Sequence, residues 1–187
     1  MNTTTLSPLL PLKETIAERR KQAISRREDL AFLRSTVATV LFVAIVVTLF
    51  CVFFGFHIVE GSDMFPSLAD GDLALCYRTN DFKKNDIVFY EADGETHCGR
   101  VVAKGGDIIR ISEGGTFTVN GTVQESEIIY PTYPRTFDGD YSAEVPEGMV
   151  FILGDFRTEA KDSRDYGFIA VDDIGKKVIT IIRHRKF

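Results

Sequence analysis

The stretch "VATVLFVAIVVTLFCVFFGF" (37–56) divides this 187-residue chain into two parts of different character. No Asp, Glu, Lys or Arg occurs between Thr36 and Val59. A helix rises about 1.5 Å per residue, so an apolar helix of this length would cross a hydrocarbon core of about 30 Å. We therefore predict a transmembrane helix over residues 36–59.

Two other interpretations of this apolar run are a cleaved signal peptide and a buried core helix. The apolar region of a signal peptide is shorter, lies nearer the N-terminus and ends in a small-residue cleavage pattern. This run instead continues as "FCVFFGFHIVEGS" (50–62). A core helix of this length normally has a polar face, which the run lacks. A single membrane span therefore fits it best.

Charge sets the expected orientation of that span. Residues 1–35 contain seven basic and four acidic groups and carry +3, whereas the first charges after the span are Glu60 and Asp63. The flanking segment that is richer in Lys and Arg normally stays in the cytoplasm. Residues 1–35 are therefore predicted to be a cytoplasmic tail and residues 60–187 an extracellular domain. The whole chain carries −5, so the remainder carries −8, which argues against nucleic acid as a partner.

Residues 60–187 are predicted to form a mainly β domain. Short apolar runs such as "DIVFYE" (86–91), "GRVVAK" (99–104) and "MVFILGD" (149–155) alternate with Asp-Gly and Asn-Gly pairs that are typical of turns. No long window has helical periodicity, and residues 130–141 are predicted to be an irregular loop. The expected fold is thus an antiparallel β domain anchored by one N-terminal transmembrane helix.

Four separated segments carry a family resemblance. They are "VEGSDMFPSLADGD" (59–72), "NDIVFY" (85–90), "GRVVAKGGD" (99–107) and "GDFRTEAKDSRDYGFI" (154–169). In order and spacing they resemble the four motifs of type I signal peptidases, over about residues 37–187. The resemblance implies a membrane-anchored β domain that cuts signal peptides at the outer membrane face with a serine and lysine dyad.

Both catalytic positions of that resemblance are substituted. Asp63 stands where the family has its serine, and Gly99 stands where it has its lysine. A serine needs a base to remove its proton, and a lysine serves as that base only when burial lowers its pKa. Gly99 supplies no base, and a carboxylate at Asp63 would have to form an anhydride while expelling an amine. The pattern predicts a family member without the dyad, unless the two substitutions are engineered.

The rest of the matched motifs is largely kept. The expected substrate-groove or oxyanion residues are Gly61, Ser62 and Met64. The residues that the resemblance makes structural supports are Asp155, Arg157, Asp162, Ser163 and Arg164. Among these, Asp162 is expected to form a partly buried ion pair with Arg164 or Arg157. The positions that depart from the family are Ser67, Asn85, Phe156 and Ala160.

Two unusual routes to activity stay open at this point. Ser62 with Lys104 is one, although a shift of one residue in a strand turns a side chain to the opposite face. The other is a proton-sharing pair of Asp63 with Asp155 or Asp162, as in aspartic proteases. Nothing in the spacing favours either.

Cysteine and histidine give little further chemistry. Cys51 lies in the predicted span, so Cys76 and Cys98 either form one disulfide or remain two buried thiols. His57 and His97 are interpreted as ordinary polar contacts. No metal site and no cofactor are expected.

The closest resemblance is to the signal-peptidase-like proteins of streptococcal pilus loci, in which Asp and Gly likewise replace the dyad. It implies a non-hydrolytic chaperone or scaffold in pilus assembly, with pilin subunits or signal-peptide segments as partners, together with sortase and membrane lipid. An extended segment is expected to add as a strand along residues 58–62. The segment "MFP" (64–66) either touches lipid or forms a packed turn. The alternatives are an active signal peptidase with a non-standard nucleophile and an interaction module unrelated to pili.

Overall fold

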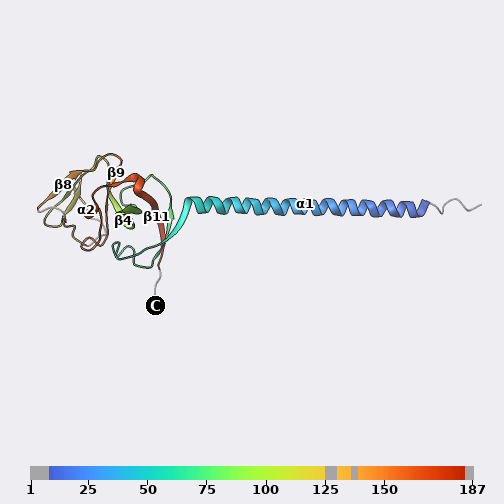
Figure 1. The fold of residues 1–187 in the computed structure, drawn as a ribbon, viewed down its shortest axis with the longest axis horizontal. Coiled ribbons are helices and arrows are strands. Elements are labelled where there is room, and N and C mark those ends of the chain that lie inside the picture. The colour runs from blue at the N-terminus through green and yellow to red at the C-terminus, as the bar shows by residue number, and fades with distance from the viewer. Residues whose placement is uncertain (1–8, 125–129, 136–138, 184–187) are drawn as a thin grey trace, which may run out of the picture. The chain divides into compact units, whose positions relative to one another are not determined.

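The first unit of the computed structural model is a single long helix, α1 (Leu9–Phe53). The structure describes residues 9–124, 130–135 and 139–183, and these fall into two units, Met1–Cys51 and Val52–Phe187 (Figure 1). Among the described residues, the part of α1 over Arg19–Phe53 is the one helix long and apolar enough to cross a membrane. An N-terminal helix that fits a membrane anchor is thus present, and its membrane boundaries stay a prediction.

The helix ends earlier than residue 59. Phe54–Ile58 form strand β1, which pairs residue by residue with β2 (Leu73–Tyr77), from Phe54 opposite Tyr77 to Ile58 opposite Leu73. A run of Phe, Gly and Ile suits a half-exposed strand as well as an apolar helix. Pairing with β2 therefore decides the structure of these last residues.

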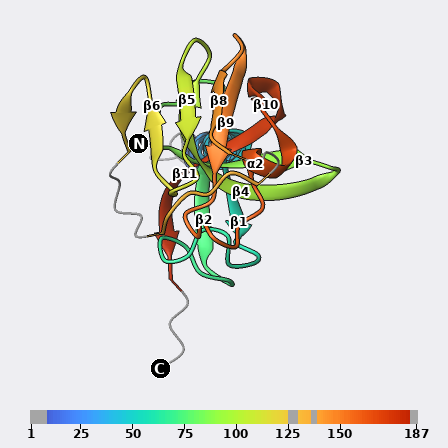
Figure 2. The same ribbon diagram turned by 90° about the vertical axis from the view of Figure 1, so that its left-hand side faces the viewer.

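The second unit is mainly antiparallel β, as predicted. Its described residues form a seven-stranded sheet of order β1-β2-β11-β3-β4-β9-β10 and a four-stranded sheet of order β7-β6-β5-β8 (Figure 2). The remaining strands of the larger sheet are β3 (Ile87–Ala92), β4 (Glu95–Lys104), β9 (Met149–Leu153), β10 (Ile169–Ala170) and β11 (Ile174–Ile182). The smaller sheet contains β5 (Ile108–Ile111), β6 (Phe117–Val119), β7 (Thr122–Val123) and β8 (Tyr141–Glu144). Two short helical turns, α2 (Ser163–Tyr166) and η1 (Val171–Asp173), follow β9.

Alternation of side chains along β9 joins the two sheets. Phe151 and Leu153 pack with Ile109 and Ile111 of the smaller sheet, whereas Ile152 belongs to a second cluster on the other face. Successive side chains of a strand point to opposite faces, so β9 contributes to both cores. This strand leads directly into the fourth matched motif, which it holds against the sheet.

The loop over residues 59–72 folds back onto the larger sheet. Its ends are joined where the Val59 N–H donates to the Asp72 carbonyl and the Gly71 N–H to the Val59 carbonyl, both at 2.9 Å. Met64 is buried in a third cluster under this loop, whereas Phe65 is 46% exposed. At Met64 the segment "MFP" is therefore a packed turn.

Strand β1 lies at one edge of the larger sheet. Within the described part of the chain it pairs with β2 alone, so its other edge faces no strand. Its side chains Phe56 and Ile58 are 57% and 59% exposed. An exposed edge of this kind offers main-chain groups to an added strand.

The cysteines of the β domain are not joined. Cys76 of β2 and Cys98 of β4 are free and buried in the cluster beneath the loop over 59–72. The alternative of two buried thiols is the one that the structure contains.

Candidate functional site

The backbone at Asp63 is fixed against the fourth matched motif. The carbonyl of Asp63 accepts a hydrogen bond of 2.9 Å from the Phe156 N–H. Gly154 lies so close that a Cβ there would overlap Ala160 Cβ and come within 2.7 Å of the Asp63 carbonyl oxygen. Glycine at 154 and alanine at 160 thus permit the close approach that places Asp63.

The Asp63 side chain is half-buried and has neither a hydrogen-bond donor nor an ion-pair partner among the described residues. Burial raises the pKa of Asp63, while the charges of His97, Arg135 and Lys161 partly oppose that rise. Partial burial without a donor costs some stability, so the Asp63 side chain does not help to hold the fold together.

Gly99 lies buried in β4, opposite Val88 of β3. A Cβ built on Gly99 would overlap Ile152 Cγ2 and lie 3.2 Å from Tyr90 Cε1. The space that a side chain at this position would enter is thus already filled. Neighbouring residues would have to shift before a lysine could fit at 99.

Two buried polar atoms near this position stand out, one on Tyr90, which the sequence did not single out, and one on His97. The Tyr90 hydroxyl and His97 Nε2 are buried without a hydrogen-bond partner among the described residues. Their rings lie 5.7 Å apart between centroids, and their strand positions are opposite each other. Burial raises the pKa of Tyr90, and the charges of Asp162 and Asp63 add to that rise. The interpretation of His97 as an ordinary polar contact stays a prediction, and its Nε2 has no partner among the described residues.

A sequence signal for these two residues did exist. His97 precedes Gly99 by two residues, which puts both on one face of β4, and Tyr90 is related to Val88 in the same way on β3. The pairing of β3 with β4 was not predicted, so the proximity of Tyr90 to Gly99 was not predicted either.

Both carboxylate oxygens of Asp162 accept hydrogen bonds within the fourth motif. Its carboxylate caps α2, accepting from the Arg164 N–H at 3.0 Å and from the Gly154 N–H at 3.0 Å. The Arg164 guanidinium adds bonds of 2.8 and 2.7 Å to the two carboxylate oxygens. Ser163 Oγ accepts from the Ile152 N–H at 2.9 Å, which ties α2 to β9. These residues act as structural supports.

Asp155 forms a second buried ion pair, with a partner that the sequence analysis did not name. Its carboxylate accepts from Arg100 Nε at 2.8 Å and from Arg100 NH2 at 2.5 Å. Arg100 also donates to the carbonyl of Asn85 at 2.9 Å. This arginine therefore links the second, third and fourth matched motifs.

Arg157 does not pair with Asp162. Its NH1 donates to Thr132 Oγ1 at 2.8 Å, and its guanidinium lies 5.8 Å from the centre of the Phe117 ring. Burial lowers the pKa of Arg157 to about 10. Of the two partners expected for Asp162, the structure selects Arg164.

The two unusual catalytic pairs are not assembled. The Lys104 ammonium donates to the carbonyl of Phe82, and Ser62 is exposed, so no described contact joins Ser62 to Lys104. Asp155 and Asp162 are each bound to an arginine, so neither shares a proton with Asp63.

A cavity of about 450 Å³, which we call the Asp63 cavity, opens between β1 and the start of β4. Its polar lining includes three carboxylates and two imidazoles, and no lysine or arginine lines it among the described residues. The residues that matter below are Ile58, Glu60, Asp63, Glu95 and His97. Gly61 and Ser62 are exposed in the adjoining turn, where the Gly61 N–H donates to the Asp70 carboxylate at 2.9 Å.

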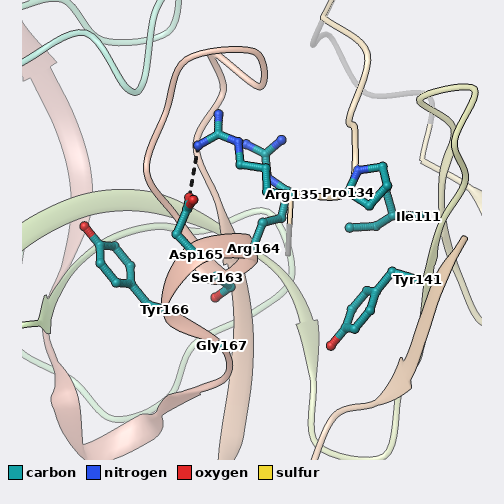
Figure 3. Close-up of a pocket in the computed structure, with 9 residues that line it drawn as sticks. All are labelled: Ile111, Pro134, Arg135, Tyr141, Ser163, Arg164, Asp165, Tyr166 and Gly167. Atoms are coloured by element: carbon teal, nitrogen blue, oxygen red, sulfur yellow. Dashed lines mark hydrogen bonds and ion pairs between the residues drawn. The ribbon is translucent and has the colours of Figure 1, made fainter. Parts of the chain in front are cut away.

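A second cavity of about 310 Å³ lies between α2 and the smaller sheet (Figure 3). In its lining, the Arg135 guanidinium donates to the Asp165 carboxylate at 3.0 Å, and it also donates to the carbonyl of Thr158 at 3.0 Å. The other arginine in its lining, Arg164, is paired with Asp162, so both basic groups are neutralised. The Asp63 cavity is therefore the candidate site.

Comparisons with known proteins agree on one family. The family profile described as "Signal peptidase, peptidase S26" matches residues 32–182. Signal peptidase I of Bacillus caldolyticus is 32% identical over 152 residues, which are 73% of this chain and 83% of that protein. Signal peptidase IB of Staphylococcus aureus (strain MW2) is 28% identical over 143 residues, which are 65% of this chain and 74% of that protein.

A solved structure is also similar. The crystal structure of a signal peptidase I from Enterococcus faecalis V583 aligns at a TM-score of 0.44 with 22% sequence identity. The alignment covers 54% of this chain and 97% of the other.

Proposed function

Because the chain belongs to the signal peptidase family, peptidase S26, we propose that it binds an extended polypeptide segment at the Asp63 cavity without hydrolysing it. The support for this proposal is the resemblance that places Gly99 at the position of the family's lysine, together with the filling of the space beside Gly99 by Ile152 and Tyr90. Without a lysine at 99, a serine at 63 would lack the base of the family's dyad, and a carboxylate at 63 would still have to expel an amine.

Binding can rely on the backbone. Strand β1 offers a free edge, and its last residue, Ile58, lines the Asp63 cavity. A segment added along β1 gains main-chain hydrogen bonds, and every second side chain of that segment faces the same way. Affinity then needs no catalytic group, and the cavity provides specificity.

The proposed setting is the outer face of a membrane. The apolar part of α1 crosses the bilayer, with residues 1–35 in the cytoplasm and residues 60–187 outside the cell. A segment that arrives at the membrane surface would thus meet the β1 edge. Lipid would be a second contact.

The proposed partner is a pilin subunit or another segment that carries a signal peptide. The support is the replacement of serine and lysine by Asp63 and Gly99, which is similar to the signal-peptidase-like proteins of streptococcal pilus loci. The protein would then act as a chaperone or scaffold that holds pilin for sortase. Crosslinking in the native membrane followed by identification of the partner tests this assignment, and recovery of proteins other than pilin or sortase would contradict it.

An active signal peptidase with a non-standard nucleophile is the second candidate. The relatives described above are named signal peptidase I, and the charge of His97 acts on the Asp63 carboxylate. Attack by Asp63 on a peptide would have to form an anhydride and protonate the leaving amine. The imidazole of His97, which lines the same cavity, has suitable chemistry for that proton transfer.

A cleavage assay separates the two candidates. The full chain in detergent micelles is incubated with a pilin precursor that keeps its signal peptide, and a signal peptidase I with an intact dyad serves as the positive control. We expect binding without cleavage. Processing at one site that disappears with Asp63→Ala or Ser62→Ala would overturn the non-hydrolytic proposal and support the active enzyme.

A further inference from the structure

Three polar groups around the old dyad position lack partners. The Asp63 carboxylate, the Tyr90 hydroxyl and His97 Nε2 all lack a hydrogen bond to any described residue. Tyr90 is 1% exposed, and its pKa responds to the charge of Asp63. Buried polar groups in native proteins are normally satisfied. Tyr90 does not line the Asp63 cavity, whereas His97 and the half-buried Asp63 do, so a group bound there could supply a partner to His97 Nε2 and to the Asp63 carboxylate.

The charge of the Asp63 cavity defines that group. Glu60, Asp63 and Glu95 contribute carboxylates to the lining, and no lysine or arginine lines the cavity in the described ranges. Two more distant cations, Arg135 and Lys161, act on Asp63 without forming an ion pair with it. The cavity is therefore complementary to a positively charged donor.

Position and size favour a side chain over a free ion. The Asp63 cavity has a volume of about 450 Å³, and Ile58 of the free β1 edge lines it. Volumes of about 300–1,000 Å³ are typical of pockets that enclose organic groups. A strand added along β1 would direct alternate side chains towards the cavity.

We infer that the Asp63 cavity takes a lysine or arginine side chain of the bound extended segment. This inference rests on the proposed function, because the segment must first add along β1. The basic group would donate to the Asp63 carboxylate and to His97 Nε2, and Glu60 and Glu95 would complete its surroundings. Recognition would then depend on a positive charge at one position of the segment.

The test uses fluorescent peptides and the full chain in detergent micelles. The peptides are fluorescein-Thr-Val-Thr-X-Thr-Val-Thr-amide, with X as lysine, norleucine or glutamate, and binding is followed by fluorescence anisotropy. Norleucine keeps the length of the side chain and removes its charge. Asp63→Asn removes the carboxylate charge with little change of shape, and the exposed Asp172→Asn, in η1, is the matched control.

We expect the lysine peptide to bind at least about tenfold more tightly than the norleucine peptide, because bonds to charged groups are the stronger class. Asp63→Asn should remove most of that difference, whereas Asp172→Asn should leave it unchanged. Glu95→Gln should reduce it by a smaller factor. The glutamate peptide should bind most weakly.

The outcomes separate this inference from the proposed function. If lysine and norleucine peptides bind equally and Asp63→Asn affects neither, the basic side chain is excluded while strand addition stands. If no peptide binds the native chain, strand addition fails and the inference fails with it. A thermal unfolding curve for each variant shows whether lost binding reflects loss of fold.

Discussion

The carboxylates of the fourth matched motif and the Asp63 carboxylate differ in their burial and in their hydrogen-bond partners. Asp155 and Asp162 are completely buried, and each is held by an arginine in short hydrogen bonds. Asp63 is half-buried and has no donor in the described part of the chain. The difference shows that the framework carboxylates, Asp155 and Asp162, are fully paired where they join the sheet, whereas the Asp63 carboxylate is left without a donor among the described residues.

The largest expected effect is on the framework side of this comparison. Asp162→Ala removes a carboxylate that caps α2, binds Gly154 and neutralises Arg164. Breaking a buried pair leaves an uncompensated charge and costs about 3–5 kcal/mol. We expect a loss of that size in the free energy of unfolding, measured by near-ultraviolet circular dichroism during urea titration of the full chain. Asp172→Asn serves as the surface control, and an equally small loss for both would contradict the structural role.

The second effect concerns the space beside Gly99. Gly99→Ala places a methyl group against Ile152 and Tyr90, and overpacking of this kind costs about 1–3 kcal/mol. Gly175→Ala is the matched control, because a Cβ at Gly175 meets nothing within 4 Å. The same titration checks both variants.

The same packing at Gly99 predicts the result of placing a serine at 63 and a lysine at 99. Asp63→Ser with Gly99→Lys should give no cleavage in the precursor assay while Ile152 and Tyr90 stay in place. Efficient cleavage by this double variant would show that the space is readily vacated, and would remove the packing basis of the comparison.

A smaller and opposite effect is expected at Asp63. Burial raises the pKa of Asp63 above its unfolded value, so the charged form destabilises the folded state at neutral pH. Asp63→Asn should therefore raise the melting temperature, by about 1–3 °C at pH 7. The advantage should shrink as the pH falls through the folded pKa, because the native carboxyl group then becomes neutral too. Melting curves between pH 4 and pH 8 check this, and a lower melting temperature for Asp63→Asn at neutral pH would mean that the carboxylate is compensated.

The smallest effect is expected at Ser62. Its side chain is exposed and is not bound to Lys104, so Ser62→Ala should change stability by less than about 0.5 kcal/mol. Peptide binding should stay the same. Loss of binding would place the Ser62 hydroxyl on the bound segment.

Much of the framework could be predicted from the sequence, because local patterns determine it. Alternating apolar runs predicted the antiparallel β class, and the motif around Asp162 predicted an ion pair with Arg164 or Arg157, of which the structure contains the pair with Arg164. The ion pair of Arg100 with Asp155 joins residues 55 positions apart, so no local pattern indicates it.

The candidate site was harder to predict. The positions of Asp63 and Gly99 were found by family resemblance, but the filling of the space at Gly99 depends on side chains from β3 and β9. That packing depends on strand pairing, and β4 pairs with β9 through an irregular register between Val101 and Ala103. The strand at Phe54–Ile58 was missed for another reason, because its apolar residues continue the composition of the helix before it.

The overlap at Gly99 also limits how a lysine could arise at that position. A change at 99 alone meets Ile152 and Tyr90, and it brings no benefit while position 63 lacks a hydroxyl. A change at 63 alone creates a hydroxyl without a base. A serine and lysine pair at 63 and 99 would therefore need coordinated substitutions, including changes at the residues that fill the space beside Gly99.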